Sequence, residues 1–133
     1  MTLDPIWLAR LFVLAFFAAC FLQSSLDKVT DWKGNMEYLS GHFAASPLAR
    51  LVPLMLLIIT LFETAAGVLS AVGLVLHALR PAETFVPVLA LCFVAASLVM
   101  LFTGQRIAKD YAGAAVLAAY FAVAILGFVL MTP

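Results

Sequence analysis

Long apolar stretches alternate with short polar segments along this chain. A membrane-spanning helix needs about 20 apolar residues, and four stretches qualify, at about residues 5–26, 47–79, 83–102 and 110–131. Asp4 followed by Pro5 is a typical helix start, and Ser46 followed by Pro47 repeats that signal. The pattern predicts a single all-α integral membrane domain over residues 1–133, built as a four-transmembrane-helix bundle.

The second stretch is longer than a bilayer requires. Its roughly 33 residues would measure about 50 Å as a helix, whereas the hydrocarbon core is about 30 Å thick. We expect Pro53 to kink this helix and to leave residues 47–52 at the interface. Arg80 and Pro81 should end it, and Gly104 should end the third helix.

The segment between the first two spans, 27-DKVTDWKGNMEYLSGHFAASP-47, has a different period. Apolar residues recur at i, i+4, i+7 and i+11, as Trp32, Met36, Leu39 and Phe43. This single stripe predicts a short amphipathic helix over about residues 31–45, which lies on the membrane or caps the bundle. We call this helix the lid.

Composition supports the membrane assignment and narrows the function. The chain is 66% hydrophobic and 11% charged, with seven Lys and Arg against seven Asp and Glu. Balanced charge without a basic patch argues against a nucleic-acid partner. Cys20 and Cys92 lie in apolar runs without a CxxC motif, which predicts two small buried side chains. His42 and His77 lack companions at metal-ligand spacing, so no metal or haem is assigned.

Glu63 is the exceptional residue, because it falls near the middle of the second span. An ionised carboxylate facing lipid costs at least about 2.5–3.5 kcal/mol, so Glu63 should face the bundle. Either it is ionised and paired with Arg10, or it is neutral and hydrogen-bonded to Tyr120 or Ser70; we favour a contribution from Arg10. The candidate ligand-binding residues are Arg10, Glu63 and Tyr120, and the alternative is a structural lock between helices. No catalytic residue is assigned, since no hydrolase or nucleotide-binding motif occurs.

A second polar layer is expected where the first span, the lid and the turn between the last two spans meet. We call it the polar cap, and it serves either as interface anchors or as a gate above a cavity leading to Glu63. Its members are Gln23, Asp27, Lys28, Trp32, Gln105, Arg106, Lys109, Asp110 and Tyr111.

Three stretches together resemble the DoxX family of small bacterial membrane proteins: 26-LDKVTDWKGNMEYLSGHF-43, 62-FETAAGVLSAVGL-74 and 104-GQRIAKDYAGAA-115. The resemblance implies a four-span bundle in the bacterial cytoplasmic membrane, with recurrent polar positions at Arg10, Lys28 and Glu63. Members of that family include subunits of a thiosulfate:quinone oxidoreductase and components of oxidative-stress complexes. Distant relatives resemble cargo receptors or assembly chaperones, so the resemblance implies fold more firmly than function.

The orientation of the chain in the membrane has two competing predictions. The positive-inside rule, applied to the first and third loops, places both loops in the cytoplasm. The family resemblance implies instead that the first loop lies outside.

The sequence favours an accessory membrane subunit that holds a small apolar ligand, a quinone or a lipid, near Glu63. No electron-transfer cofactor site is visible in the sequence, so redox chemistry would need a partner protein. The rival hypothesis is an assembly or interaction protein that docks a partner through the lid. A transporter is weaker, since no inverted repeat is visible, although a homo-oligomer is compatible with the sequence.

Overall fold

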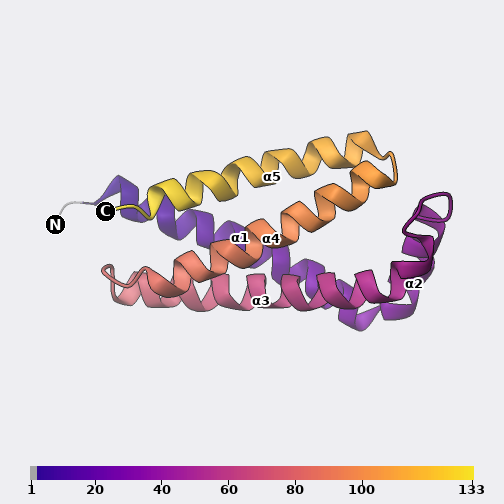
Figure 1. The fold of residues 1–133 in the computed structure, drawn as a ribbon. Coiled ribbons are helices and arrows are strands. Elements are labelled where there is room, and N and C mark those ends of the chain that lie inside the picture. The colour runs from indigo at the N-terminus through magenta and orange to yellow at the C-terminus, as the bar shows by residue number, and fades with distance from the viewer. Residues whose placement is uncertain (1–2) are drawn as a thin grey trace.

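The computed structural model describes residues 3–133 and has an all-α fold, shown in Figure 1. Its helices are α1 (Pro5–Thr30), α2 (Trp32–His42), the short 3-10 helix η1 (Ala49–Leu51), α3 (Val52–Leu79), α4 (Phe85–Ile107) and α5 (Tyr111–Leu130). Four segments are long and apolar enough to cross a membrane: α1, η1 with α3, α4 and α5. The predicted four-span bundle with an additional amphipathic helix is therefore confirmed, and the protein is a multi-pass membrane protein.

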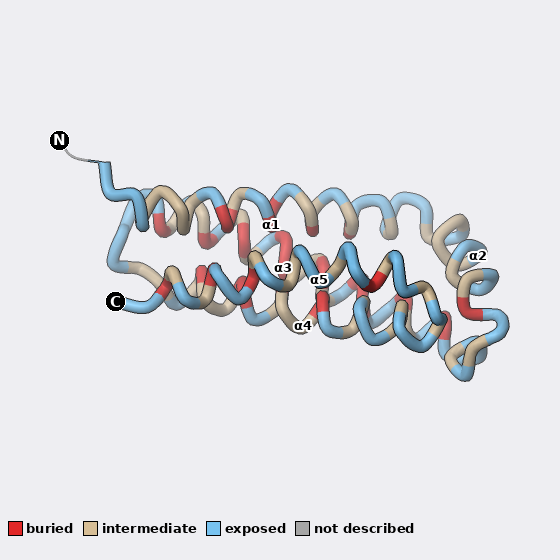
Figure 2. Tube along the Cα trace, turned by 90° about the horizontal axis from the view of Figure 1, so that it is seen from above, coloured by how far each residue is buried: buried red, intermediate tan, exposed pale blue. Residues whose placement is uncertain are grey.

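The bundle is an up-and-down arrangement of neighbouring helices. α3 packs against both α1 and α4, and α5 packs mainly on α4. The start of α1 and the end of α5 lie at the same end of the bundle, and α2 crosses the opposite end, as Figure 1 shows. Buried positions lie on the faces that the spanning helices turn toward one another (Figure 2). Fully buried Phe17, Leu14, Leu91 and Val94 form much of this core.

Small residues have two different roles in the bundle. Gly67 permits close approach of α3 to α1, because a Cβ there would lie 2.8 Å from the backbone nitrogen of Leu22. Gly73 has the same role against Pro87 of α4, at 3.3 Å. The alanine stripe of the fourth span is instead exposed along its length, at Ala112, Ala115, Ala119 and Ala122.

Acidic side chains accept hydrogen bonds from the first amides of several helices. The Asp4 side chain accepts a hydrogen bond from the amide of Ile6, with Pro5 in the first turn. Asp110 caps α5 by accepting from the amide of Gly113 at 2.9 Å. Glu83 accepts from the amide of Phe85 at 2.9 Å, which satisfies a free donor at the start of α4.

Three predicted boundaries were wrong. α3 begins at Val52 rather than at Pro47, and Pro53 lies in its first turn instead of kinking it. This placement suits proline, because first-turn amides have no partner within the helix. α1 continues beyond residue 26 to Thr30. α4 continues through Gly104 to Ile107, because Gly104 does not adopt the positive φ with which glycine ends a helix.

The end of the bundle opposite the lid is fastened by side chains that bind main-chain carbonyls. The indole of Trp7 donates to the carbonyl of His77 at 3.2 Å. His77 is buried, and its Nδ1 lies 2.8 Å from the carbonyl of Glu83, which requires a proton on that nitrogen. Cys92, by contrast, is exposed on α4 and Cys20 is half-buried, so the expectation of two buried thiols was wrong for Cys92.

Candidate ligand cavity and buried ion pair

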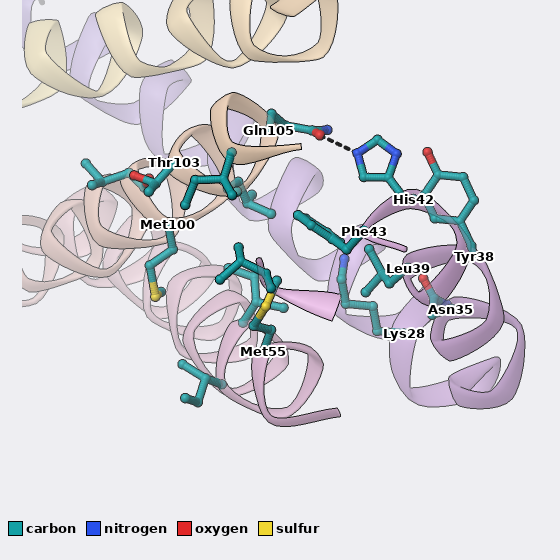
Figure 3. Close-up of a pocket in the computed structure, with 17 residues that line it drawn as sticks. Lys28, Asn35, Tyr38, Leu39, His42, Phe43, Met55, Met100, Thr103 and Gln105 are labelled. Carbon is teal, nitrogen blue, oxygen red and sulfur yellow. Dashed lines mark hydrogen bonds between the residues drawn. The ribbon is translucent and has the colours of Figure 1, made fainter. Parts of the chain in front are cut away.

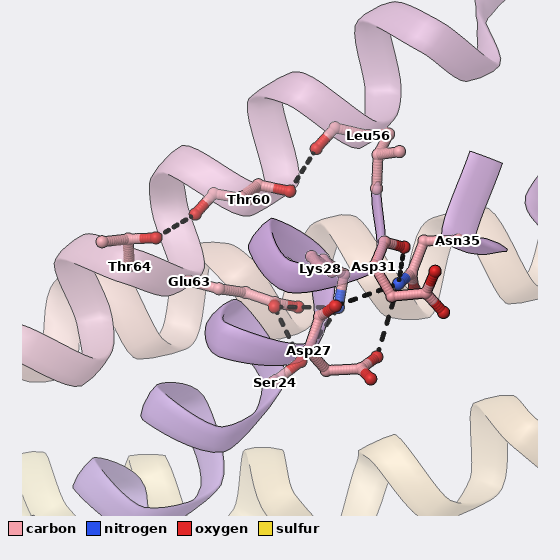
Figure 4. Close-up of polar contacts among 9 residues, drawn as sticks. All are labelled: Ser24, Asp27, Lys28, Asp31, Asn35, Leu56, Thr60, Glu63 and Thr64. Carbon is pink, nitrogen blue, oxygen red and sulfur yellow. Dashed lines mark hydrogen bonds and ion pairs between the residues drawn. The ribbon is translucent and has the colours of Figure 1, made fainter. Parts of the chain in front are cut away.

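Glu63 is buried inside the bundle, with 1% of its side chain exposed. Its Oε2 accepts a hydrogen bond from the Ser24 hydroxyl at 2.7 Å and another from the Lys28 ammonium at 3.0 Å (Figure 4). Lys28 also donates to the Ser24 hydroxyl oxygen at 2.9 Å. The carboxylate therefore has a cationic partner and a neutral donor, both supplied by α1, as an intramembrane charge requires.

The spacing of α1 explains why these partners face Glu63. Leu14, Phe17, Phe21, Ser24 and Lys28 follow one another at i, i+3, i+7, i+10 and i+14, which is one face of a helix. The first three are buried apolar residues of the core. The same face becomes polar over its last turns, at the depth where α3 presents Glu63.

The hydroxyls next to Glu63 along α3 are satisfied within their own helix. Thr60 donates to the carbonyl of Leu56 at 2.6 Å, and Thr64 donates to the carbonyl of Thr60 at 2.7 Å (Figure 4). Such bonds to the preceding turn are the usual way in which Thr is accommodated in an apolar helix. Ser70, an expected partner of Glu63, makes no hydrogen bond through its buried hydroxyl in the described part of the chain.

The expected pair between Arg10 and Glu63 is not formed. Arg10 instead donates through Nε to the carbonyl of Leu130 and through a terminal nitrogen to the carbonyl of Thr132, at 3.0 Å. The last carbonyls of a helix have no intrahelical partners and carry partial negative charge, so an Arg side chain stabilises them. Arg10 thus fastens the start of α1 to the end of α5.

Tyr120 also lies apart from Glu63. Its half-buried ring packs against Phe16 of α1, with 5.9 Å between ring centroids. Phe16 is itself exposed on the outer surface of α1. Arg10 therefore lies at the end of the bundle opposite the lid, and Glu63 lies between α1 and α3. Tyr120 lies at the contact between α1 and α5, which we call the α1–α5 seam. The three expected ligand-binding residues do not form one site.

A cavity of about 510 Å³ lies under the lid, between the first half of α3 and the last half of α4 (Figure 3). This volume falls within the range of about 300–1,000 Å³ that is typical of small-molecule sites. Its lining is mainly apolar, but Lys28, Asn35, Tyr38, His42 and Gln105 bring polar atoms to the lid side. The other lining residues are Leu39, Phe43, Leu48, Met55, Ile58, Ile59, Val99, Met100, Leu101, Thr103, Gly104 and Ile107.

Phe43 and His42 of the lid both contact α4 beside the cavity. The buried Phe43 ring lies against Gly104, where an added Cβ would be 3.4 Å from its tip. His42 Nε2 lies 2.7 Å from Gln105 Oε1, and this contact crosses from the lid to α4 (Figure 3). His42 also stacks on Tyr38, with 5.6 Å between ring centroids. The Trp32, Met36, Leu39 and Phe43 stripe is accordingly half-buried or buried.

The polar cap is divided among several roles. Lys28 and Gln105 line the cavity. Asp27 is exposed and lies 3.4 Å from the Asn35 amide nitrogen, while Gln23 is exposed on α1. Trp32 is half-buried at the start of the lid. The turn into α5 is a structural unit: Arg106 lies 4.5 Å above the Tyr111 ring, Lys109 has a positive φ of 61°, and Asp110 caps the helix.

Sequence reasoning overlooked the apolar part of the cavity and the lid contact of His42. Met55 and Met100 are unremarkable members of apolar spans, and no sequence period marks them as cavity residues. The lid stripe did carry a usable signal, because Leu39 and Phe43 must cover an apolar surface somewhere. The continuation of the inward face of α1 through Ser24 to Lys28 was a second signal, and it identifies the partner of Glu63.

No protein-family model matches the chain, and no curated protein or solved structure matches it either.

Proposed function

We propose that this protein is a DoxX-like accessory membrane subunit that holds a small apolar ligand, a quinone or a lipid, in the cavity under the lid. The proposal includes the bacterial cytoplasmic membrane as its location and a quinone-dependent oxidoreductase as its partner, which would supply any electrons. Support for the family comes from the three resembling stretches, and support for the ligand comes from the cavity.

The cavity with Lys28 at its polar side is the observation that carries the proposal. An ammonium group has three donors, and two of those of Lys28 are used by Ser24 and Glu63. Lys28 also lines the cavity, so its remaining donor is available to a ligand there. A ligand atom that accepts this hydrogen bond would be fixed beneath the lid.

Charge favours a neutral acceptor over an anion. Glu63 lies directly behind Lys28 and already compensates its charge, at 3.0 Å. An anionic head group would compete with that carboxylate for the same ammonium and would add a net charge in a poorly solvated site. The carbonyl of a quinone, or the ester of a neutral or zwitterionic lipid, satisfies the donor without that cost.

Native mass spectrometry of the protein in mild detergent, with extraction of its bound molecules, tests this proposal. We expect a stoichiometric quinone or a single lipid species in the wild type. Met100→Trp should remove it by filling the cavity, and Lys28→Met should weaken it by removing the donor. Val116→Trp is the matched control for a new indole, because Val116 is exposed on α5 and lies outside the cavity lining.

Two results contradict the proposal. One is a wild-type protein that carries only bulk lipid under conditions in which the bundle stays folded. The other is a bound molecule that survives Met100→Trp but is lost in Tyr120→Phe, which would place the ligand at the α1–α5 seam instead.

A second candidate function is partner docking through the lid. The observation that favours it is the outward face of α2, where Lys33, Glu37 and Ser40 are exposed and no residue of the helix is fully buried. Under this proposal, the charge exchange Lys33→Glu with Glu37→Lys should release a co-purifying membrane protein while the bundle remains folded. Unchanged recovery of that protein would count against docking.

A further inference from the structure

The cavity under the lid has an apolar edge on the outer surface of the bundle. Ile58 of α3, Val99 of α4 and Ile107 of α4 all line it, and they are 38%, 50% and 37% exposed. In a membrane protein, apolar side chains exposed on spanning helices contact lipid tails. The opening between α3 and α4 therefore borders lipid.

The depth of this edge supports the same conclusion. Ile58 is six residues into α3, which is about 9 Å from the start of the helix. Val99 is eight residues before the end of α4, or about 12 Å. These positions fall within a hydrocarbon core of about 30 Å rather than at the aqueous surface.

Most polar side chains of the cavity lie at its lid side. The exception, Thr103, donates its hydroxyl to the carbonyl of Val99. Figure 3 shows Lys28, His42 and Gln105 gathered at the lid side, with Met55 and Met100 away from it. The aqueous side is covered by the lid through Phe43 and the His42–Gln105 contact. A molecule with a polar head beneath the lid would therefore direct its apolar end toward Ile58 and Val99.

We infer that the ligand is an amphiphile dissolved in the bilayer, which enters sideways between α3 and α4 and keeps its tail in the opening formed by Ile58 and Val99. This inference rests on the proposed function and adds the class of ligand and its route. The shared chemistry is a neutral hydrogen-bond acceptor at the head and an apolar tail. A long-tailed quinone and a zwitterionic phospholipid both provide it.

The test measures uptake and release of two probes by the protein reconstituted in liposomes: a tritiated decyl-substituted benzoquinone and a tritiated phosphatidylethanolamine. An indole in the opening should obstruct passage while leaving the head site under the lid intact. Val99→Trp and Ile58→Trp should slow both uptake and release about tenfold or more. They should lower equilibrium occupancy less than Met100→Trp does, because they displace only the tail of the ligand. Val116→Trp and Val68→Trp, also on exposed positions of spanning helices, should exchange the probe at the wild-type rate.

The outcomes separate the route from the binding function. If the wild type binds a probe and both opening variants exchange it at the wild-type rate, the sideways route is wrong and the ligand passes the lid. If the wild type binds neither probe at equilibrium, the proposed function fails first and the route fails with it. The probe that binds decides between a quinone and a phospholipid.

Discussion

At the residue scale, the pairing of Glu63 with Lys28 explains how a carboxylate persists at the centre of a membrane helix. Glu63 is about 17 Å from the start of α3, too deep to reach water by extending its side chain. Lys28 is close to the end of α1, and 14% of its side chain is exposed. When the pair is broken, the Lys28 ammonium can therefore move toward water, whereas the Glu63 carboxylate stays buried.

This difference predicts an asymmetry between single substitutions. Lys28→Met leaves a buried carboxylate without its cation and should cost about 3 kcal/mol. This is the lower end of the range for a broken buried pair, because the Ser24 hydroxyl still donates to the carboxylate. Glu63→Leu should cost less, because the Lys28 ammonium can extend toward the interface. Unfolding free energies in mixed micelles would measure both. Equal costs would contradict the asymmetry.

The double variant Lys28→Met with Glu63→Leu provides the control for that experiment. Replacing both members of a buried pair by apolar groups is often neutral or stabilising, so the double variant should recover most of the loss in Lys28→Met. A double variant at least as unstable as the sum of the single variants would show that the pair does not act as a unit.

The sequence predicted the depth of Glu63 and its need for a partner, but not which cation supplies it. Arg10 was the expected cation, yet its side chain binds carbonyl acceptors at the end of α5. Unpaired carbonyls of a helix end are not visible in sequence until the termini are known to adjoin. Lys28 was assigned to the cap because α1 was expected to end at residue 26, one turn too early.

At the element scale, the apolar spans, their order and the lid helix followed from the sequence, and their boundaries did not. Apolar length is a strong signal for a spanning helix. Proline and glycine are ambiguous, however, because their effect depends on position. Pro53 begins a helix rather than bending one, and Gly104 admits the lid rather than ending α4.

Arg10 makes an element-scale prediction. Arg10→Met removes the donors that hold the last carbonyls of α5 and should raise hydrogen exchange over residues 127–132, with a stability loss of about 1–2 kcal/mol. Ligand binding under the lid should not change, because that cavity lies at the other end of the bundle. If Arg10→Met loses the ligand without an increase in hydrogen exchange, Arg10 is part of the ligand-binding site and the account is wrong.

The close packing of α1 on α3 gives a second prediction at the scale of elements. A Cβ at Gly67 would lie 2.8 Å from the backbone nitrogen of Leu22, so Gly67→Ala must separate the two helices and should cost about 1–3 kcal/mol. Gly41→Ala is the matched control, because nothing lies within 4 Å of its added Cβ. Thermal unfolding in detergent would compare them. A Gly67→Ala variant as stable as Gly41→Ala would contradict the packing account.

At the scale of the whole molecule, the two ends of the bundle differ in the contacts that hold them together. One end is fastened by Trp7, Arg10 and His77, whose bonds all run to main-chain carbonyls. The lid end combines a side chain–side chain contact between His42 and Gln105 with a cavity and a buried ion pair. Ligand binding is accordingly expected at the lid end alone.

The central claim is that a ligand lies under the lid with its head at Lys28, and photocrosslinking tests it most directly. A decyl-tailed benzoquinone carrying a diazirine on its ring, together with a matching phosphatidylethanolamine labelled near its ester, would be activated in the reconstituted protein and mapped by peptide sequencing. We expect labelling at the lid and at the adjoining parts of α3 and α4, on Leu39, Phe43, Met55 or Met100. Labelling confined to the α1–α5 seam around Phe16 and Tyr120, or spread evenly over lipid-facing positions, would contradict the account.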